Sequence, residues 1–290
     1  MGFGRDAAED FPAPIELVNR PTRNLPTLII YFFGPTKPPQ NTTSKTADHA
    51  ITEASSANFS FDSLKTVFLG QMDTKNSSAI KRFENQLADN ATALQSGVYD
   101  SLIRLWKAAD KLNMAAYYFS EKAKLENSEK NLNFAGQLHL DLMHEAPYQG
   151  LQVWEAKQAI NCFEQSLEAN PNNDTVKMAM ASCFIQGVGE TMKGVQILLG
   201  IVKEHPDHIP ANILLGKMAV QSQQFDKAIV RLERLKTIEP KNTEILYFLA
   251  EAYKGKGEKE KAIVLFEQCK KLVNNPAFSK DIDTYINSFK

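Results

Sequence analysis

The stretch QFDKAIVRLERLKTIEP, residues 224–240, decides how this chain folds. Its apolar residues recur at helical spacing, and it ends at a proline, which cannot continue a helix. The tetrapeptide KAIV at 227–230 returns at 261–264, an offset of 34 residues, and KGVQ stands the same distance upstream at 193–196. The stretch therefore predicts one unit of a repeat, and its charged residues are interpreted as a solvent-facing side rather than as catalysts.

The same register extends beyond the tetrapeptide. Small residues recur where two helices must approach closely, larger ones follow beside them, and a helix-ending residue closes each unit. The aligned sets are Leu215-Gly216, Ala228, Leu232 and Pro240; Leu249-Ala250, Ala262, Phe266 and Asn274; and Ala181-Ser182, Gly194, Leu198 and Pro206. Three consecutive units are predicted at 175–208, 209–242 and 243–276.

This pattern resembles the tetratricopeptide repeat (TPR), a helix–turn–helix unit of 34 residues. The resemblance implies an all-α solenoid wound as a right-handed superhelix. Two less regular units are predicted upstream, at 96–129 and 130–174. The second is about ten residues too long, and we expect the excess, PYQGLQVWEAK at 147–157, to form a loop at one edge of the solenoid.

Both ends of the array are predicted to be capped. An N-terminal helical cap is expected at 61–95, and a C-terminal capping helix at 277–290 seals the other end. The cap carries apolar residues at helical spacing, and so does the capping helix. These residues are Ile80, Phe83, Leu87, Ala91 and Leu94 in the cap, and Phe278, Ile282, Tyr285 and Ile286 in the capping helix.

Residues 1–60 are predicted to be a disordered or extended leader. They contain one apolar run, LPTLIIYFFG at 25–34, and a linker rich in Pro, Ser, Thr and Asn. The run is shorter than the ~20 residues that a membrane span needs. Two interpretations stay open: an extended leader of a cytoplasmic protein, or an anchor that tethers an envelope assembly factor to the inner membrane.

A closer resemblance bears on this choice. The stretches AAYYFSEKAKLENSEKN, TMKGVQILLGIVKEHPDH and NNPAFSKDIDTYINSF are similar to those of a largely uncharacterised group of TPR proteins from Bacteroidota. Members of that group carry one hydrophobic N-terminal segment before the repeats. Here the apolar run is short and lies behind a leader of about 24 residues.

The chemistry-bearing residues form no recognisable reaction centre. The net charge is −1 and no basic run forms a stripe, which argues against nucleic acid as a partner. The segment GVGETMKGV at 187–195 is predicted to be a helix–turn–helix joint, because it lacks the Gly-Lys-Ser/Thr of a phosphate loop. Cys162, Cys183 and Cys269 are expected to be packing residues. No catalytic residue, cofactor or metal is therefore predicted. One less favoured alternative stays open, an enzyme or metal-binding protein built around HPDH at 205–208 and the inserted segment of the second unit.

The expected function is that of a non-enzymatic scaffold. TPR proteins bind partners in a concave groove lined by the first helix of each unit, so the resemblance assigns groove residues by repeat position. They are Ala179, Cys183, Gln186, Ile213, Lys217, Val220, Gln221, Tyr247, Glu251 and Lys254. The Lys, Asn and Arg set with which some members grip a C-terminal carboxylate is missing. We therefore expect an internal peptide, a helix or another copy of this protein as the ligand.

Overall fold

The computed structural model describes residues 60–88 and 92–290. These residues form α-helices joined by short turns, together with one π-helical turn, and no strand occurs in these two ranges. The predicted all-α class, built from helix–turn–helix units, is confirmed. The predicted leader up to residue 59, with its apolar run at 25–34, lies outside the described residues, as do Ala91 and the side chain of Leu94.

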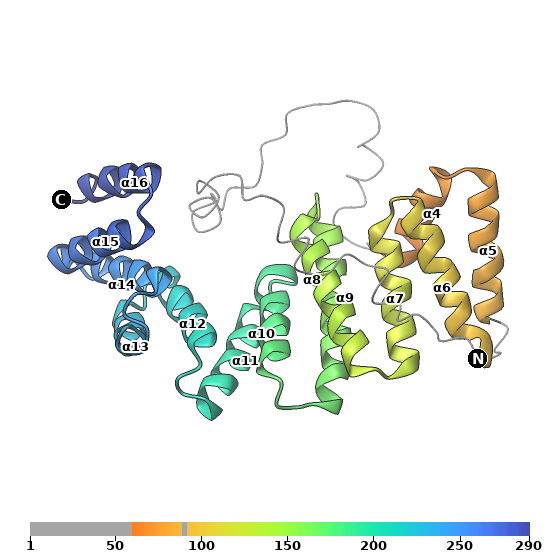
Figure 1. The fold of residues 1–290 in the computed structure, drawn as a ribbon, viewed down its shortest axis with the longest axis horizontal. Coiled ribbons are helices and arrows are strands. Elements are labelled where there is room, and N and C mark those ends of the chain that lie inside the picture. The colour runs from red at the N-terminus through yellow and green to blue at the C-terminus, as the bar shows by residue number, and fades with distance from the viewer. Residues whose placement is uncertain (1–59, 89–91) are drawn as a thin grey trace. The chain divides into compact units, whose positions relative to one another are not determined.

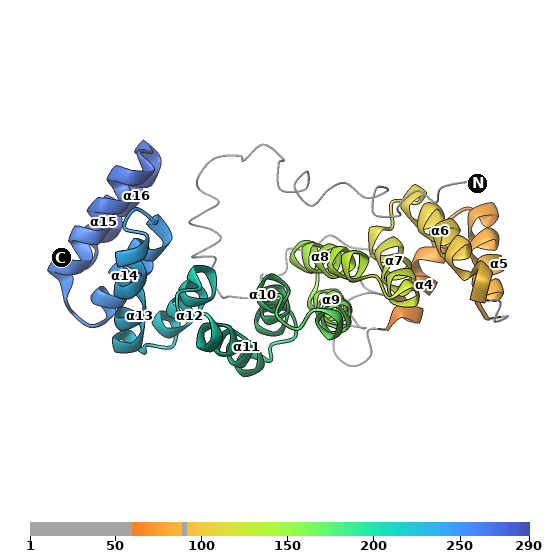
Figure 2. The same cartoon turned by 60° about the horizontal axis from the view of Figure 1, so that its bottom comes forward.

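The chain divides into two compact units that meet in sequence at Gly194 and Val195. Most helices that follow one another in the chain pack side by side, as α8 and α9 do in both views (Figure 1) (Figure 2). The N-terminal unit contains α4 (Phe61–Gly70), α5 (Thr74–Ala88), α6 (Thr92–Ala108), α7 (Leu112–Glu126), α8 (Glu129–Glu145), α9 (Gln149–Ala169), α10 (Asp174–Ser182) and η2 (Cys183–Gly187). The helix α11 (Thr191–Glu204) crosses the boundary, and the C-terminal unit continues with α12 (Ile209–Gln221), α13 (Phe225–Ile238), α14 (Thr243–Gly255), α15 (Lys259–Val273) and α16 (Pro276–Asn287).

The predicted spans 209–242 and 243–276 each hold two of these helices, α12 with α13 and α14 with α15, although the repeat boundaries and the superhelical winding stay predictions. Side-chain caps explain where several helices begin, because the first backbone N–H groups of a helix lack partners within it. The Asn242 Oδ1 atom accepts from the Glu244 and Ile245 amides at 3.0 and 3.3 Å at the start of α14. Asn275 caps α16 in the same manner, with Pro276 in the first turn.

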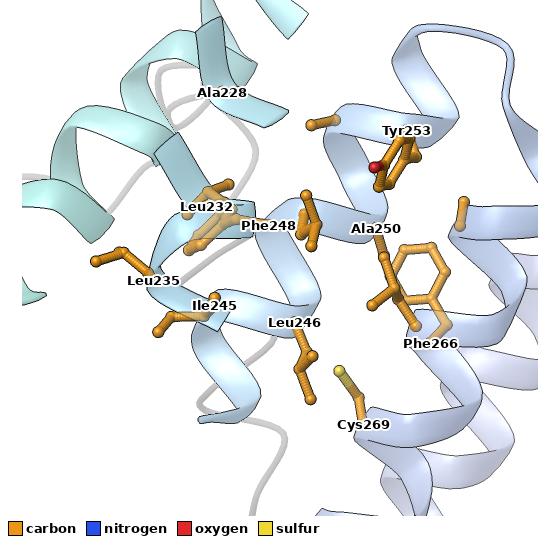
Figure 3. Close-up of a cluster of buried hydrophobic side chains, with 14 of the residues drawn as sticks. Ala228, Leu232, Leu235, Ile245, Leu246, Phe248, Ala250, Tyr253, Phe266 and Cys269 are labelled. Atoms are coloured by element: carbon orange, nitrogen blue, oxygen red, sulfur yellow. The ribbon is translucent and has the colours of Figure 1, made fainter. Parts of the chain in front are cut away.

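The repeat register determines the packing of the C-terminal unit. Ala228, Ala250 and Ala262 are fully buried, and the larger Leu232 and Phe266 fill the space beside them (Figure 3). A Cβ atom added at Gly216 would lie 2.8 Å from the Leu232 side chain. Small residues therefore stand where the helices approach closely, as the sequence predicts.

The predicted loop at 147–157 is wrong. Residues 146–148 alone connect α8 to α9, and the extra residues lengthen these helices to 17 and 21 residues. Leu151, Trp154 and Glu155 are buried in the part of α9 that was expected to be a loop. Their helical spacing gives this part an inward face, which outweighs the Pro147 and Gly150 that suggested a break.

The segment GVGETMKGV forms a joint between two helices, as predicted. The turn η2 ends at Gly187 and α11 begins at Thr191. A Cβ atom at Gly187 would lie 2.2 Å from Ala156 Cβ and 2.7 Å from Met143 Sδ, so close packing requires this glycine. Gly189 has a φ of +75°, a conformation that L side chains rarely adopt.

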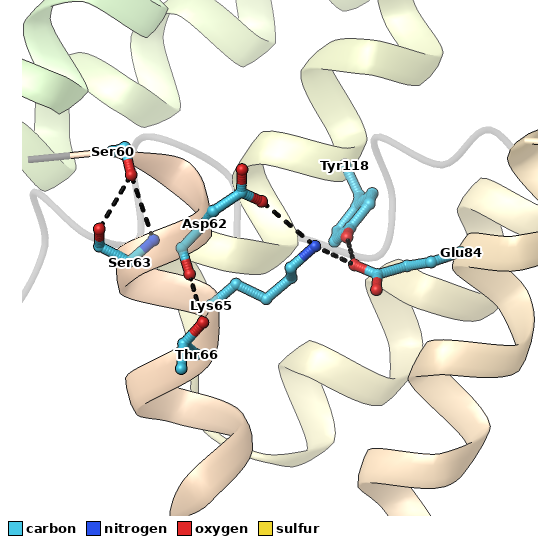
Figure 4. Close-up of polar contacts among 7 residues, drawn as sticks. All are labelled: Ser60, Asp62, Ser63, Lys65, Thr66, Glu84 and Tyr118. Carbon is cyan, nitrogen blue, oxygen red and sulfur yellow. Dashed lines mark hydrogen bonds and ion pairs between the residues drawn. The ribbon is translucent and has the colours of Figure 1, made fainter.

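Polar contacts hold α4, the first helix of the described residues, to the rest of the N-terminal unit (Figure 4). Ser60 caps α4 by accepting from the Ser63 amide at 3.2 Å. Lys65 of α4 pairs with Glu84 of α5 at 3.2 Å, and Glu84 also accepts a hydrogen bond from the Tyr118 hydroxyl of α7. One carboxylate thus joins three helices, although it lies near the surface, where such pairs stabilise a fold only modestly.

Among the residues that the structure describes, no helix combines the length and the apolar character required to cross a bilayer.

The three cysteines are free and buried, as predicted. Burial raises the pKa of the Cys162 thiol to about 11 and those of Cys183 and Cys269 to about 12. The thiolate is the reactive form, so we expect none of the three to react rapidly with Ellman's reagent at neutral pH in the folded protein. All three should react in concentrated urea. A thiol that reacts rapidly without denaturant would contradict this prediction.

Candidate binding face on the first helices

The ten predicted groove residues lie on the first helices of three successive predicted repeats. Ala179 lies on α10, and Cys183 and Gln186 lie on η2. The other seven belong to the C-terminal unit, on the neighbouring helices α12 and α14. They are Ile213, Lys217, Val220 and Gln221 on α12, and Tyr247, Glu251 and Lys254 on α14.

The predicted residues of the N-terminal unit offer little accessible surface. Cys183 is fully buried, and Ala179 is half-buried. Gln186 is exposed, and its backbone carbonyl accepts a hydrogen bond from Gln152 Nε2 at 3.1 Å. Of these three residues, Gln186 alone places a side chain in solvent.

Helix α12 provides a more mixed surface. Ile213 is buried in the core of the C-terminal unit, whereas Lys217 and Val220 are half-buried and Gln221 is exposed. The position equivalent to Lys217 in the previous predicted repeat is Cys183, so the same position is buried in one repeat and partly accessible in the next. Repeat position alone therefore does not determine accessibility.

A pair of opposite charges lies between α12 and α14. Partial burial lowers the pKa of the Lys217 ammonium group, and the nearby Glu244 carboxylate partly offsets this effect. Burial in turn raises the pKa of Glu244, against the attraction of Lys217. The Lys217 Nζ atom also lies 5.8 Å from the centre of the Phe248 ring. Two charged groups are thus partly removed from water beside an aromatic ring, an environment that is common at binding sites. We call the surface of Lys217, Val220, Gln221 and Glu244 the α12–α14 face.

The C-terminal part of α14 is covered by the last helix, α16. The Lys254 Nζ atom donates a hydrogen bond to the Tyr285 hydroxyl and lies 4.2 Å from the centre of the Tyr285 ring. The same atom lies 5.5 Å from the centre of the Phe289 ring and 3.5 Å from a Glu251 carboxylate oxygen. Tyr247 packs edge to face on Phe266, with ring centroids 5.5 Å apart. Tyr247, Glu251 and Lys254 therefore make contacts within the protein, and the accessible face is centred on α12 and the start of α14.

The sequence did not reveal a buried polar network in the N-terminal unit. His139 Nδ1 lies 2.5 Å from Glu155 Oε2, and His139 Nε2 lies 2.9 Å from the Ser120 Oγ atom. Asn113 Nδ2 donates to Glu155 Oε1 at 2.5 Å. These residues come from α7, α8 and α9, and their spacing along the chain gives no motif that could have identified them.

The Ser120–His139–Glu155 order is that of a hydrolase triad, but its burial favours a structural role. All three side chains are 0% exposed, so a substrate carbonyl has no access to the serine. The Ser120 hydroxyl also lies 2.8 Å from the Ala116 carbonyl oxygen of its own helix. The network satisfies buried polar groups and ties three helices together.

The HPDH turn has structural partners. His208 Nδ1 accepts from the Ala211 amide at 3.2 Å and so caps α12. The Asp207 carboxylate pairs with Arg234 of α13 at 2.6 Å. The His208 side chain thus stabilises the start of α12, and the Asp207 side chain connects the turn to α13.

A family model described as tetratricopeptide repeat matches residues 219–278, which reach from the end of α12 into α16. Several solved structures are similar to the chain at low identity. The crystal structure of MamA has a TM-score of 0.48 at 17% identity, covering 64% of this chain and 95% of that one. YrrB, described as a TPR protein with an unusual peptide-binding site, has a TM-score of 0.46 at 15% identity, with coverages of 70% and 97%. A tetratricopeptide repeat protein from Parabacteroides merdae has a TM-score of 0.44 at 14% identity, with coverages of 74% and 86%.

Proposed function

We propose that this chain, which carries tetratricopeptide repeats, is a non-enzymatic scaffold that binds a peptide or a helix of a partner protein through the α12–α14 face. The repeat assignment at 219–278 supports the class of function, because stacked helix pairs present extended surfaces that suit peptides and helices. The observation that carries the proposal is the half-buried pair of Lys217 and Glu244 beside Phe248.

The composition of this face suits a peptide better than a small molecule. Lys217 provides donors and Glu244 provides acceptors, so the two can pair with a peptide backbone or with side chains of either charge. Val220, three residues after Lys217 on α12, adds half-buried apolar area on the same side of that helix. Both charged groups already have part of their hydration removed, so a ligand that hydrogen-bonds to them loses less on binding. The proposal assigns no reaction and no cofactor.

Affinity capture from the native host tests this function. We expect Lys217→Gln combined with Val220→Asp to lower capture of the principal partner at least about tenfold, because both substitutions change the centre of the face. Neither residue is fully buried, although Val220 packs against the core of the C-terminal unit, so far-ultraviolet circular dichroism and thermal unfolding are recorded to show that the variant is folded. Lys280→Gln on α16, which removes an exposed lysine elsewhere, is the matched control and should capture normally. Equal capture by all three proteins would refute the assignment of this face.

A further inference from the structure

The second helices α13 and α15 each carry a shallow groove on the side that faces solvent. The groove on α13 has a volume of about 500 Å³ and that on α15 about 360 Å³. The first, here the α13 groove, is lined by Pro206, Asn212, Asp226, Lys227, Val230, Arg231 and Arg234. The second, the α15 groove, is lined by Glu233, Lys236, Tyr253, Glu260, Lys261, Val264, Leu265 and Gln268. Every α13 residue of the first groove has its counterpart 34 residues later on α15 in the second.

The two grooves share an apolar centre. Val230 is 74% exposed and its counterpart Val264 is 57% exposed. A single exposed valine is ordinary on a protein surface. Here the valine recurs at the same helix position inside a groove, so an apolar side chain of a ligand could rest on it in either place.

Charge distinguishes the two grooves. In the α13 groove, Arg231 is half-buried, and its guanidinium donates to the neutral Asn212 side chain. No carboxylate among the described residues forms an ion pair with Arg231. A charge that is partly removed from water without a counter-ion is costly, and a bound anion would relieve that cost.

Two further cations border the α13 groove. Lys227 donates to Gln224 Oε1 at 2.7 Å, and Arg234, which is more than half exposed, forms an ion pair with Asp207 at 2.6 Å. The one acidic residue in the lining, Asp226, already pairs with Lys256 at 2.7 Å.

The α15 groove lacks this excess of positive charge. Leu265 and Gln268 stand where the α13 groove has its two arginines. The two lysines that remain, Lys236 and Lys261, are balanced by Glu233 and Glu260. The α15 groove therefore occupies the same repeat positions as the α13 groove but lacks its excess of positive charge, so it serves as an internal comparison.

We propose that the α13 groove is a second interaction site, which binds an acidic segment of a partner protein. A carboxylate of the segment pairs with the planar fork of Arg231, with Lys227 and Arg234 beside it, and an adjacent apolar side chain covers Val230. Nucleic acid fits less well, because the groove has an apolar centre and the chain's net charge of −1 gives no attracting field. This site lies on a second helix and does not depend on the α12–α14 face, so it extends the proposed function.

Fluorescence anisotropy with a defined peptide tests the site. The probe is a short labelled peptide in which glutamates flank a central leucine, and glutamine replaces glutamate in its neutral counterpart. We expect Arg231→Leu with Arg234→Gln, which gives the α13 groove the side chains of the α15 groove, to weaken binding at least about tenfold. Lys227→Gln with Arg234→Gln changes exposed side chains and serves as a second variant that preserves Asn212 and its contact with Arg231. Lys261→Gln in the α15 groove is the matched control and should bind as the unmodified protein does.

Three further measurements distinguish an acidic-peptide site from a general anion site: the dependence of binding on salt, binding by the α12–α14 face variant, and competition by two other anions. Binding should weaken as salt is raised, and the Lys217→Gln/Val220→Asp variant should bind the peptide normally. Equal binding of the neutral peptide, or unchanged binding by both α13 groove variants, would overturn the proposal. So would competition by inorganic phosphate or by a short single-stranded oligonucleotide as strong as that by unlabelled peptide, since the groove would then bind anions of any kind.

Discussion

Glu155→Leu should lower the free energy of unfolding of the full chain by about 2–5 kcal/mol, because each polar group that loses its hydrogen-bond partner inside the protein costs about 1–3 kcal/mol. Glu155 and His139 are both 0% exposed, and the leucine leaves His139 Nδ1 and the Asn113 amide without their partner. Urea unfolding followed by far-ultraviolet circular dichroism measures the change.

Two further variants on α9 make this result specific. Glu164→Leu introduces the same residue at an exposed position of the same helix and should change stability by less than about 0.5 kcal/mol. Glu155→Gln should be milder than Glu155→Leu, because the amide can still accept from Asn113 and face His139 with a polar group. If Glu155→Leu were as stable as the unmodified chain, the network would have no role in the fold.

Ala228→Trp should destabilise the C-terminal unit by at least about 3 kcal/mol. Ala228 is fully buried on α13, in the core that also contains Leu232 and Leu235, and there is no space for an indole ring unless the helices separate. Thermal unfolding followed by circular dichroism should show the loss.

Val230→Trp is the matched control for this substitution. It places the same side chain two residues away on the same helix, at a position that is 74% exposed. We expect its stability to stay within about 0.5 kcal/mol of that of the unmodified chain. Equal destabilisation by the two substitutions would mean that the repeat register assigns the wrong side of α13 to the core.

The sequence predicts the fold well where the repeat is regular. The recurrence of KAIV identifies the buried side of α13 and α15, because Ala228 and Ala262 are both fully buried where two helices pack closely. It does less well at 147–157, where Pro147 and Gly150 suggested a loop although the chain continues as α9. The preference of those residues for turns is weaker than the burial of Leu151 and Trp154.

The candidate site is harder to predict, because accessibility depends on neighbours that repeat position does not specify. Cys183 and Ile213 occupy groove positions but are buried, and Lys254 is covered by a helix outside the repeat register. Arg231 shows the opposite error. The sequence assigns it to the solvent side with the other charged residues of 224–240, whereas its guanidinium is half-buried and donates to the buried Asn212. That contact joins residues 19 apart in the chain, and no local sequence pattern predicts it.

The contact of α16 with α14 has a consequence for engineering the length of the protein. Phe266 and Lys254 of the last predicted repeat reach Tyr285 and Phe289, so the seal depends on one helix pair and not on the number of repeats before it. A copy of 242–275 inserted directly before Asn242 would keep the 34-residue spacing and the capping asparagine of each copy. It would also leave that seal in place, because the original repeat would still meet α16. We therefore expect the protein to accept additional repeats before its last one and to keep α16 as its C-terminal cap. This would give a series of proteins whose binding surfaces increase in length with the number of repeats.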